Sequence, residues 1–110
     1  MESIKSKYRL LSIEHGKAID KGDYKKANKL HDKITGLYSL LKSKSKLVIL
    51  EELFGDDNDS VKLWSATHSL VINENEALRI LKEIKNKSSK IEGLTASTTL
   101  HMWSEKLLNL

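Results

Sequence analysis

The chain has 110 residues and a formal net charge of +4, with 39% hydrophobic and 31% charged residues. This length predicts a single domain spanning residues 1–110, because domains usually hold about 100–200 residues. The sequence has no cysteine and no apolar run near the roughly 20 residues of a membrane helix, so we expect neither disulfides, cysteine-bound zinc nor a membrane span. Residues 1–5 lack the apolar core of a signal peptide, which predicts a cytoplasmic protein.

Residues 1–42 are expected to form a helical hairpin. Apolar residues recur along the first part at spacings of four and three, the period of an amphipathic helix. Gly22 occupies the place where a left-handed residue ends a helix, and Asp23 begins the next helix near its positive dipole end. A turn this short requires the two helices to lie antiparallel. The second helix carries its own apolar face: Tyr24, Ala27, Leu30, Ile34, Leu37, Tyr38 and Leu41.

Residues 44–108 are expected to form two stacked helix pairs. The apolar cluster at residues 47–54 predicts a short buried helix, and the run at residues 55–59 is the strongest turn signal of the chain. Asp59 or Ser60 is expected to cap the next helix, and the last helix is expected to include Leu108. Helix pairs that bury one another's apolar faces are typical of α-solenoids. The sequence therefore predicts an all-α fold of about six helices in antiparallel pairs.

Four histidines are the candidates for zinc binding or general-base chemistry: His15, His31, His68 and His101. Two histidines four residues apart beside an acid would indicate a metalloprotease, and this spacing is absent. His15 and His31 are placed to face each other across the hairpin, where we expect packing rather than a metal. We predict no catalytic residue, metal or cofactor. Trp64 and Trp103 lie on apolar helix faces and are expected in the core.

Three segments carry a family resemblance: GDYKKANKLH at residues 22–31, VKLWSATHSL at residues 61–70 and ASTTLHMW at residues 96–103. In content and order they resemble the motifs of a small bacterial family catalogued as a domain of unknown function, number twenty-nineteen. In most members two alanines follow the tryptophan of the middle motif, whereas Ser65 comes first here. The resemblance implies a HEAT-like α-α superhelix. Families of this type occur at bacterial toxin loci, where the small partner is an immunity protein.

The resemblance and the small size predict a non-catalytic protein-binding module. We expect an immunity protein that binds and neutralises a cognate toxin of a contact-dependent growth inhibition system. Residues 47–110 carry 10 acidic against 7 basic residues, and inhibitors of basic toxins use acidic surfaces because complementary charge steers association. The expected partner-binding residues lie in and before the acidic turn: Glu51, Glu52, Asp56, Asp57 and Asp59.

Nucleic-acid binding is the alternative. Residues 1–46 carry 12 basic against 5 acidic residues, and Lys25, Lys29 and Lys33 are the candidates for phosphate contacts. The sequence has only two arginines, Arg9 and Arg79, which argues against the reading of base edges. We do not expect an enzyme.

Overall fold

The computed structural model describes residues 2–88 and 90–110. Six helical elements hold 79% of these residues, which include no strand. The elements are α1 (Glu2–Asp20), α2 (Tyr24–Ser43), the 3-10 helix η1 (Leu47–Leu53), α3 (Asp59–Ser69), α4 (Glu74–Lys87) and α5 (Ile91–Ser104). The predicted all-α fold is confirmed. None of the described helices is long and apolar enough to cross a membrane.

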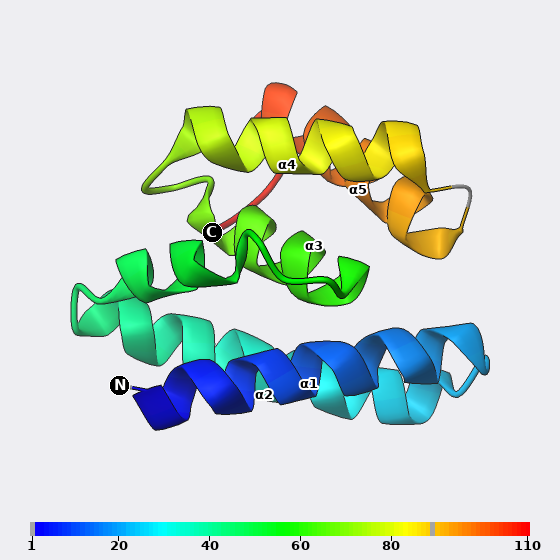
Figure 1. Cartoon of the computed structure of the whole chain (residues 1–110), viewed down its shortest axis with the longest axis horizontal. Helices are drawn as coiled ribbons and strands as arrows, with labels where there is room; N and C mark the ends of the chain where they lie inside the picture. The colour runs from blue at the N-terminus through cyan, green and yellow to red at the C-terminus, as the bar shows by residue number, and fades with distance from the viewer. Residues whose placement is uncertain (1, 89) are drawn as a thin grey trace.

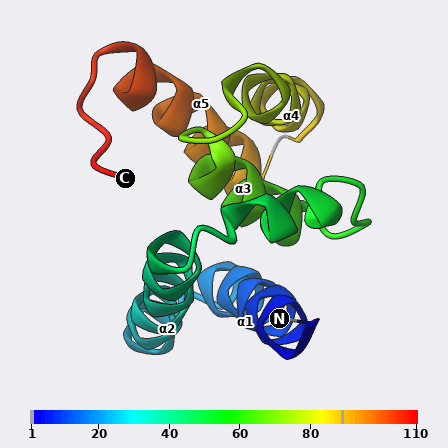
Figure 2. The same cartoon turned by 90° about the vertical axis from the view of Figure 1, so that its left-hand side faces the viewer.

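The helices lie in three stacked layers of two (Figures 1 and 2). The α1–α2 hairpin forms one layer, η1 and α3 form the middle layer, and α4 and α5 form the third. This stacking lets every amphipathic helix bury its apolar face against a neighbour. Stacked pairs are the expected arrangement, while the superhelical detail of HEAT repeats stays a prediction.

The first hairpin turn follows the sequence pattern. Gly22 has φ +72°, in the left-handed region that glycine adopts without steric cost. Asp23 caps α2 with its side chain, which accepts a hydrogen bond of 3.2 Å from the backbone N–H of Lys26. The carboxylate also suits the positive end of the helix dipole.

Two predicted helix ends are wrong. Asn58, rather than Asp59 or Ser60, caps α3, because its side-chain oxygen accepts a bond of 3.1 Å from the backbone N–H of Val61. The last helix ends at Ser104 and does not include Leu108. Lys106 has φ +60°, a conformation that cannot continue an α-helix. The chain beyond it turns back, so that Leu110 packs against both hydrophobic cores.

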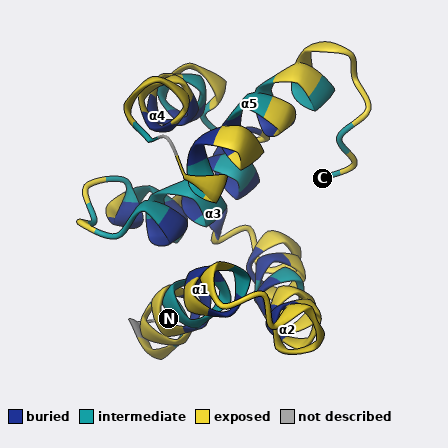
Figure 3. Cartoon of the chain, turned by 90° about the vertical axis from the view of Figure 1, so that its right-hand side faces the viewer, coloured by how far each residue is buried: buried dark blue, intermediate teal, exposed yellow. Residues whose placement is uncertain are grey.

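The two hydrophobic cores meet at α3. One lies among α1, α2 and η1 and includes Val61, while the other lies among α3, α4 and α5 and includes Ala66. Figure 3 shows buried residues where the layers meet and exposed residues on the outer faces of α2 and α4. Trp64 and Trp103 are half-buried at the edges of these cores, not within them. The indole N–H of Trp103 donates to Glu74 at 2.7 Å, which explains its place near the surface.

Candidate functional site

The first half of α1 is held to the acidic turn by charge pairs. Lys5 donates to Glu52 at 3.0 Å, and the guanidinium of Arg9 donates to Asp56 at 2.6 Å. Burial alone would raise the pKa of Asp56, but the bonds from Arg9 and from the backbone N–H of Asn58 hold it below the ordinary value. The Asp56 side chain is only 10% exposed.

The five predicted acidic residues therefore have different surroundings. Glu52 and Asp56 are paired with cations of α1, and Glu51 accepts a hydrogen bond from the side-chain amide of Asn73. Asp57 is exposed and Asp59 is half-buried in the first turn of α3. Of the five, Asp57 and Asp59 are those for which the structure records no side-chain pairing within the described residues.

A buried polar cluster lies beneath these pairs. His68 Nδ1 and the hydroxyl of Tyr8 share a hydrogen bond of 2.7 Å, and the ring of Tyr38 stacks on His68 at 4.2 Å between centroids. Burial, together with the charge that His31 can carry, lowers the pKa of His68 to about 3. The imidazole is therefore neutral at neutral pH. The Tyr38 hydroxyl is buried without a hydrogen-bond partner in the described part of the chain.

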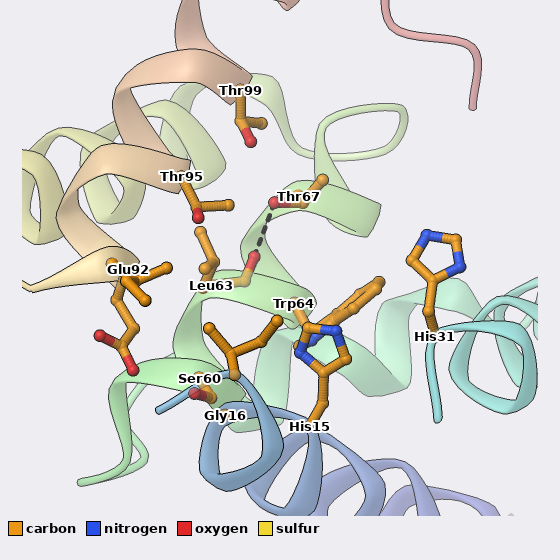
Figure 4. A pocket seen from close by; sticks show the side chains of 12 residues that line it. His15, Gly16, His31, Ser60, Leu63, Trp64, Thr67, Glu92, Thr95 and Thr99 are labelled. Carbon is orange, nitrogen blue, oxygen red and sulfur yellow. Dashed lines mark hydrogen bonds between the residues drawn. The ribbon is translucent and has the colours of Figure 1, made fainter. Parts of the chain in front are cut away.

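The second half of α1 borders an open pocket of about 300 Å³. Trp64 lies in its wall, with the rings of His15 and His31 at 5.1 and 5.5 Å between centroids (Figure 4). Burial lowers the pKa of His15, and the charge that His31 can carry lowers it further. The lining comes from four helices: His15, Gly16, Ile19, His31, Ser60, Leu63, Trp64, Thr67, Ile91, Glu92, Thr95 and Thr99.

Gly16 sets how closely α1 approaches α3 beside this pocket. A Cβ atom at Gly16 would lie 2.0 Å from Ser60 Oγ and 3.0 Å from Ser60 Cβ, so a side chain cannot be added without movement. Both residues are buried. Glu92, in the first turn of α5, lies beyond this contact and has one carboxylate oxygen buried without a hydrogen-bond partner in the described residues.

A second, polar hollow of about 250 Å³ adjoins the pocket. The two share Gly16, Ser60 and Glu92 in their linings. Four carboxylates border the hollow against two ammonium groups, which gives it a negative balance. Its charged residues are Asp20, Asp57, Asp59 and Glu92, with Lys17 and Lys90. We call the aromatic pocket and the acidic hollow together the crevice.

Lys25, Lys29 and Lys33 lie outside the crevice. They are exposed on α2 at a spacing of four residues, opposite the buried face that includes Leu30 and Ile34. The structure records no ion pair for the three within residues 2–88 and 90–110. Among all the described residues of the chain, no group of three His, Cys, Asp or Glu side chains is placed to hold a metal ion.

His15 and His31 were expected to face each other; in the structure each ring instead contacts the ring of Trp64, and no direct contact between the two histidine rings is recorded among the described residues. Asp20 and Glu92 were missed by sequence reasoning. Neither belongs to a dense acidic run in the sequence, and only the packing of α1 beside α5 brings them to the same hollow.

The fold has a solved counterpart. The crystal structure of the protein RPA1889 from Rhodopseudomonas palustris CGA009 superposes with a TM-score of 0.89 and 18% sequence identity, over 99% of this chain and 92% of that one. An identity this low shows a shared fold alone. No protein-family model and no curated protein matches the chain. The fold is therefore all-α and shared with a bacterial protein, and the family resemblance stays a prediction.

Proposed function

We propose that the chain is a non-catalytic protein-binding module, a cytoplasmic immunity protein that binds a cognate bacterial toxin through the crevice. One observation supports this most: an aromatic pocket and an acidic hollow adjoin and share Gly16, Ser60 and Glu92. Tight protein interfaces are built in this way, with an anchor side chain in a desolvated pocket and polar groups around it.

The charges of the hollow favour a basic partner. Asp57 and Asp59 belong to its lining, as do Asp20 and Glu92. Complementary charge accelerates association, which an inhibitor of a lethal protein needs. The proposed surface therefore keeps only two members of the acidic set expected from sequence and adds two acids from outside it. Glu51, Glu52 and Asp56 are not assigned to the partner, because their carboxylates already bond within the chain.

Co-expression tests this proposal, which requires that a toxin gene lie beside the gene of this chain and that the chain neutralise its product. Reversing the charge at Asp57 and Asp59 together is expected to weaken protection, because it repels a basic partner from the hollow. Reversal at Lys25 and Lys29, which lie outside the crevice, is the matched control and should leave protection intact. Far-UV circular dichroism checks that both variants remain helical. If only the lysine variant loses protection, the partner binds the exposed face of α2 and the crevice is not the binding surface.

Nucleic-acid binding is the second candidate, and the exposed row of Lys25, Lys29 and Lys33 favours it. Binding through phosphate contacts would weaken steeply as salt rises, with a slope set by the number of phosphates neutralised. We expect only weak binding that physiological salt removes. Submicromolar affinity for DNA or RNA at physiological salt would place this candidate first.

A further inference from the structure

The aromatic pocket has distinct ends. Figure 4 shows Glu92 and His31 on opposite sides, with Trp64 and His15 between them. At one end stands the Glu92 carboxylate, one oxygen of which is buried and has no hydrogen-bond partner among residues 2–88 and 90–110. Between these ends lies the Trp64 ring, and the apolar side chains of Ile19 and Leu63 also line the pocket. A ligand that matches both parts needs an apolar body and a group that satisfies a carboxylate.

From this arrangement we infer that the pocket binds an ammonium group carried on an apolar or aromatic stem, with the stem against Trp64 and the ammonium at Glu92. An uncompensated carboxylate in a partly buried site costs free energy that a cationic donor recovers. The stem gains free energy because it removes the apolar face of the indole from water. A cation close to that face gains a further cation–π attraction.

The charge around Glu92 favours a cation over an anion. Asp20, Asp57 and Asp59 lie in the adjoining hollow, where Lys17 and Lys90 offset only part of their charge. His15 opposes a cation less than an ordinary histidine would, because burial and the charge that His31 can carry lower the pKa of its imidazole. An anionic ligand would have to approach these four carboxylates, and like charges repel.

The pocket also limits the size of the ligand. Its volume of about 300 Å³ is at the lower end of the roughly 300–1,000 Å³ of small-molecule sites. The hydroxyl of Thr67 already donates to the backbone oxygen of Leu63 at 2.7 Å, so it is not free to donate to the ligand. The volume suits a single ring or a short chain that carries the ammonium group. A free metabolite or the lysine side chain of a partner protein could supply this group.

Tryptophan fluorescence of the Trp103→Phe variant measures binding, since Trp64 is then the one remaining tryptophan. Phenethylamine is the probe, and phenethyl alcohol and hydrocinnamate are its neutral and anionic counterparts. We expect saturable binding of the amine, with both counterparts about tenfold weaker or more, in line with the strength of a charge-assisted hydrogen bond. Equal affinity for the alcohol, or no saturable change with the amine, would overturn the inference.

Glu92→Gln keeps the shape of the side chain and removes its charge. It should weaken binding of the amine about tenfold and leave that of the alcohol unchanged. Glu105→Gln is the control, because Glu105 is exposed beyond the end of α5 and outside the pocket lining. If Glu92→Gln binds the amine as the unaltered protein does, the ammonium is not at Glu92 and the inference fails.

Two further ligands distinguish the source of the ammonium group. A short peptide with one lysine is compared with its acetyl-lysine counterpart. Binding of the lysine peptide above that of phenethylamine assigns the group to a partner protein, and the reverse order assigns it to a free amine. The titrations use the isolated protein, so their failure leaves the immunity proposal standing. Failure of co-expression to protect cells likewise leaves the amine site standing.

Discussion

The two halves of α1 meet the rest of the chain in opposite ways. In the first half, Lys5 and Arg9 are paired with carboxylates and Tyr8 is bonded to His68. In the second half, His15 and Gly16 border open hollows, beside a carboxylate whose buried oxygen has no partner within the described residues. Satisfied polar groups gain little from a new contact, whereas unsatisfied ones gain much. The first half thus stabilises the fold, and the second is where an outside partner gains most.

The largest expected effect is the dependence of the free energy of unfolding on pH. It arises at His68, which bonds to Tyr8 in the first half of α1. His68 has a pKa of about 3 in the folded chain, against about 6.5 for an ordinary histidine. Below about pH 6.5 the unfolded chain binds a proton that the folded chain does not, so stability falls as pH falls, by about 1.4 kcal/mol per pH unit.

Urea unfolding between pH 7 and about pH 5 measures this loss. His68→Gln removes the titrating group and should flatten the profile in this range, although it lowers stability at neutral pH. His15→Gln should change the slope less, because His15 is only half-buried. A free energy of unfolding that stays constant from pH 7 to about pH 5 in the unaltered protein would contradict the buried, neutral state of His68.

The next effect concerns the close approach of α1 and α3. Gly16→Ala should lower the free energy of unfolding by about 1–3 kcal/mol, because its Cβ would overlap Ser60. Gly36→Ala is the control: it lies in α2 with open space around it and should stabilise the helix by up to about 1 kcal/mol. Combining Gly16→Ala with Ser60→Gly should restore part of the loss. If Gly16→Ala stabilises the protein as Gly36→Ala does, Gly16 is not at a tight contact.

The smallest effect separates two tyrosines that flank the same histidine. Tyr8→Phe removes a buried bond to His68 and should cost about 1–2 kcal/mol, because the imidazole nitrogen loses its partner. Tyr38→Phe removes a hydroxyl that is buried without a partner in the described residues, so it should be neutral or stabilising. Chemical denaturation of the two variants tests the contrast, and equal losses would show that the Tyr38 hydroxyl has a partner in solution.

The local sequence pattern predicted where the helices lie in the chain better than it predicted how they pack against one another. The period of apolar residues and the glycine at position 22 predicted the hairpin, because both act within a few residues of chain. Asn58 could not be chosen over Asp59 as the cap of α3, since both side chains can accept the capping bond. The pairing of Arg9 with Asp56 joins residues far apart in sequence, which no local pattern reveals.

The candidate site was predicted only in part. His15 and His31 were expected to be near each other because the hairpin brings them together, but the third ring, Trp64, comes from a different layer. Asp57 and Asp59 were chosen for charge density, and Glu92 was not, because a single acid carries no signal of its own. Its significance arises from one carboxylate oxygen that is buried without a partner in the described part of the chain, which is a property of the packing.

Amide hydrogen exchange tests the contrast between the two halves of α1 most directly. Exchange is measured on the chain alone and on the chain bound to a toxin that it neutralises on co-expression. We expect slower exchange on binding at residues 15–20, 57–60 and 90–95, which border the crevice, and unchanged exchange at residues 5–12. Slower exchange confined to residues 5–12, or to residues 25–29 of α2, which carry Lys25 and Lys29, would contradict the crevice as the binding surface.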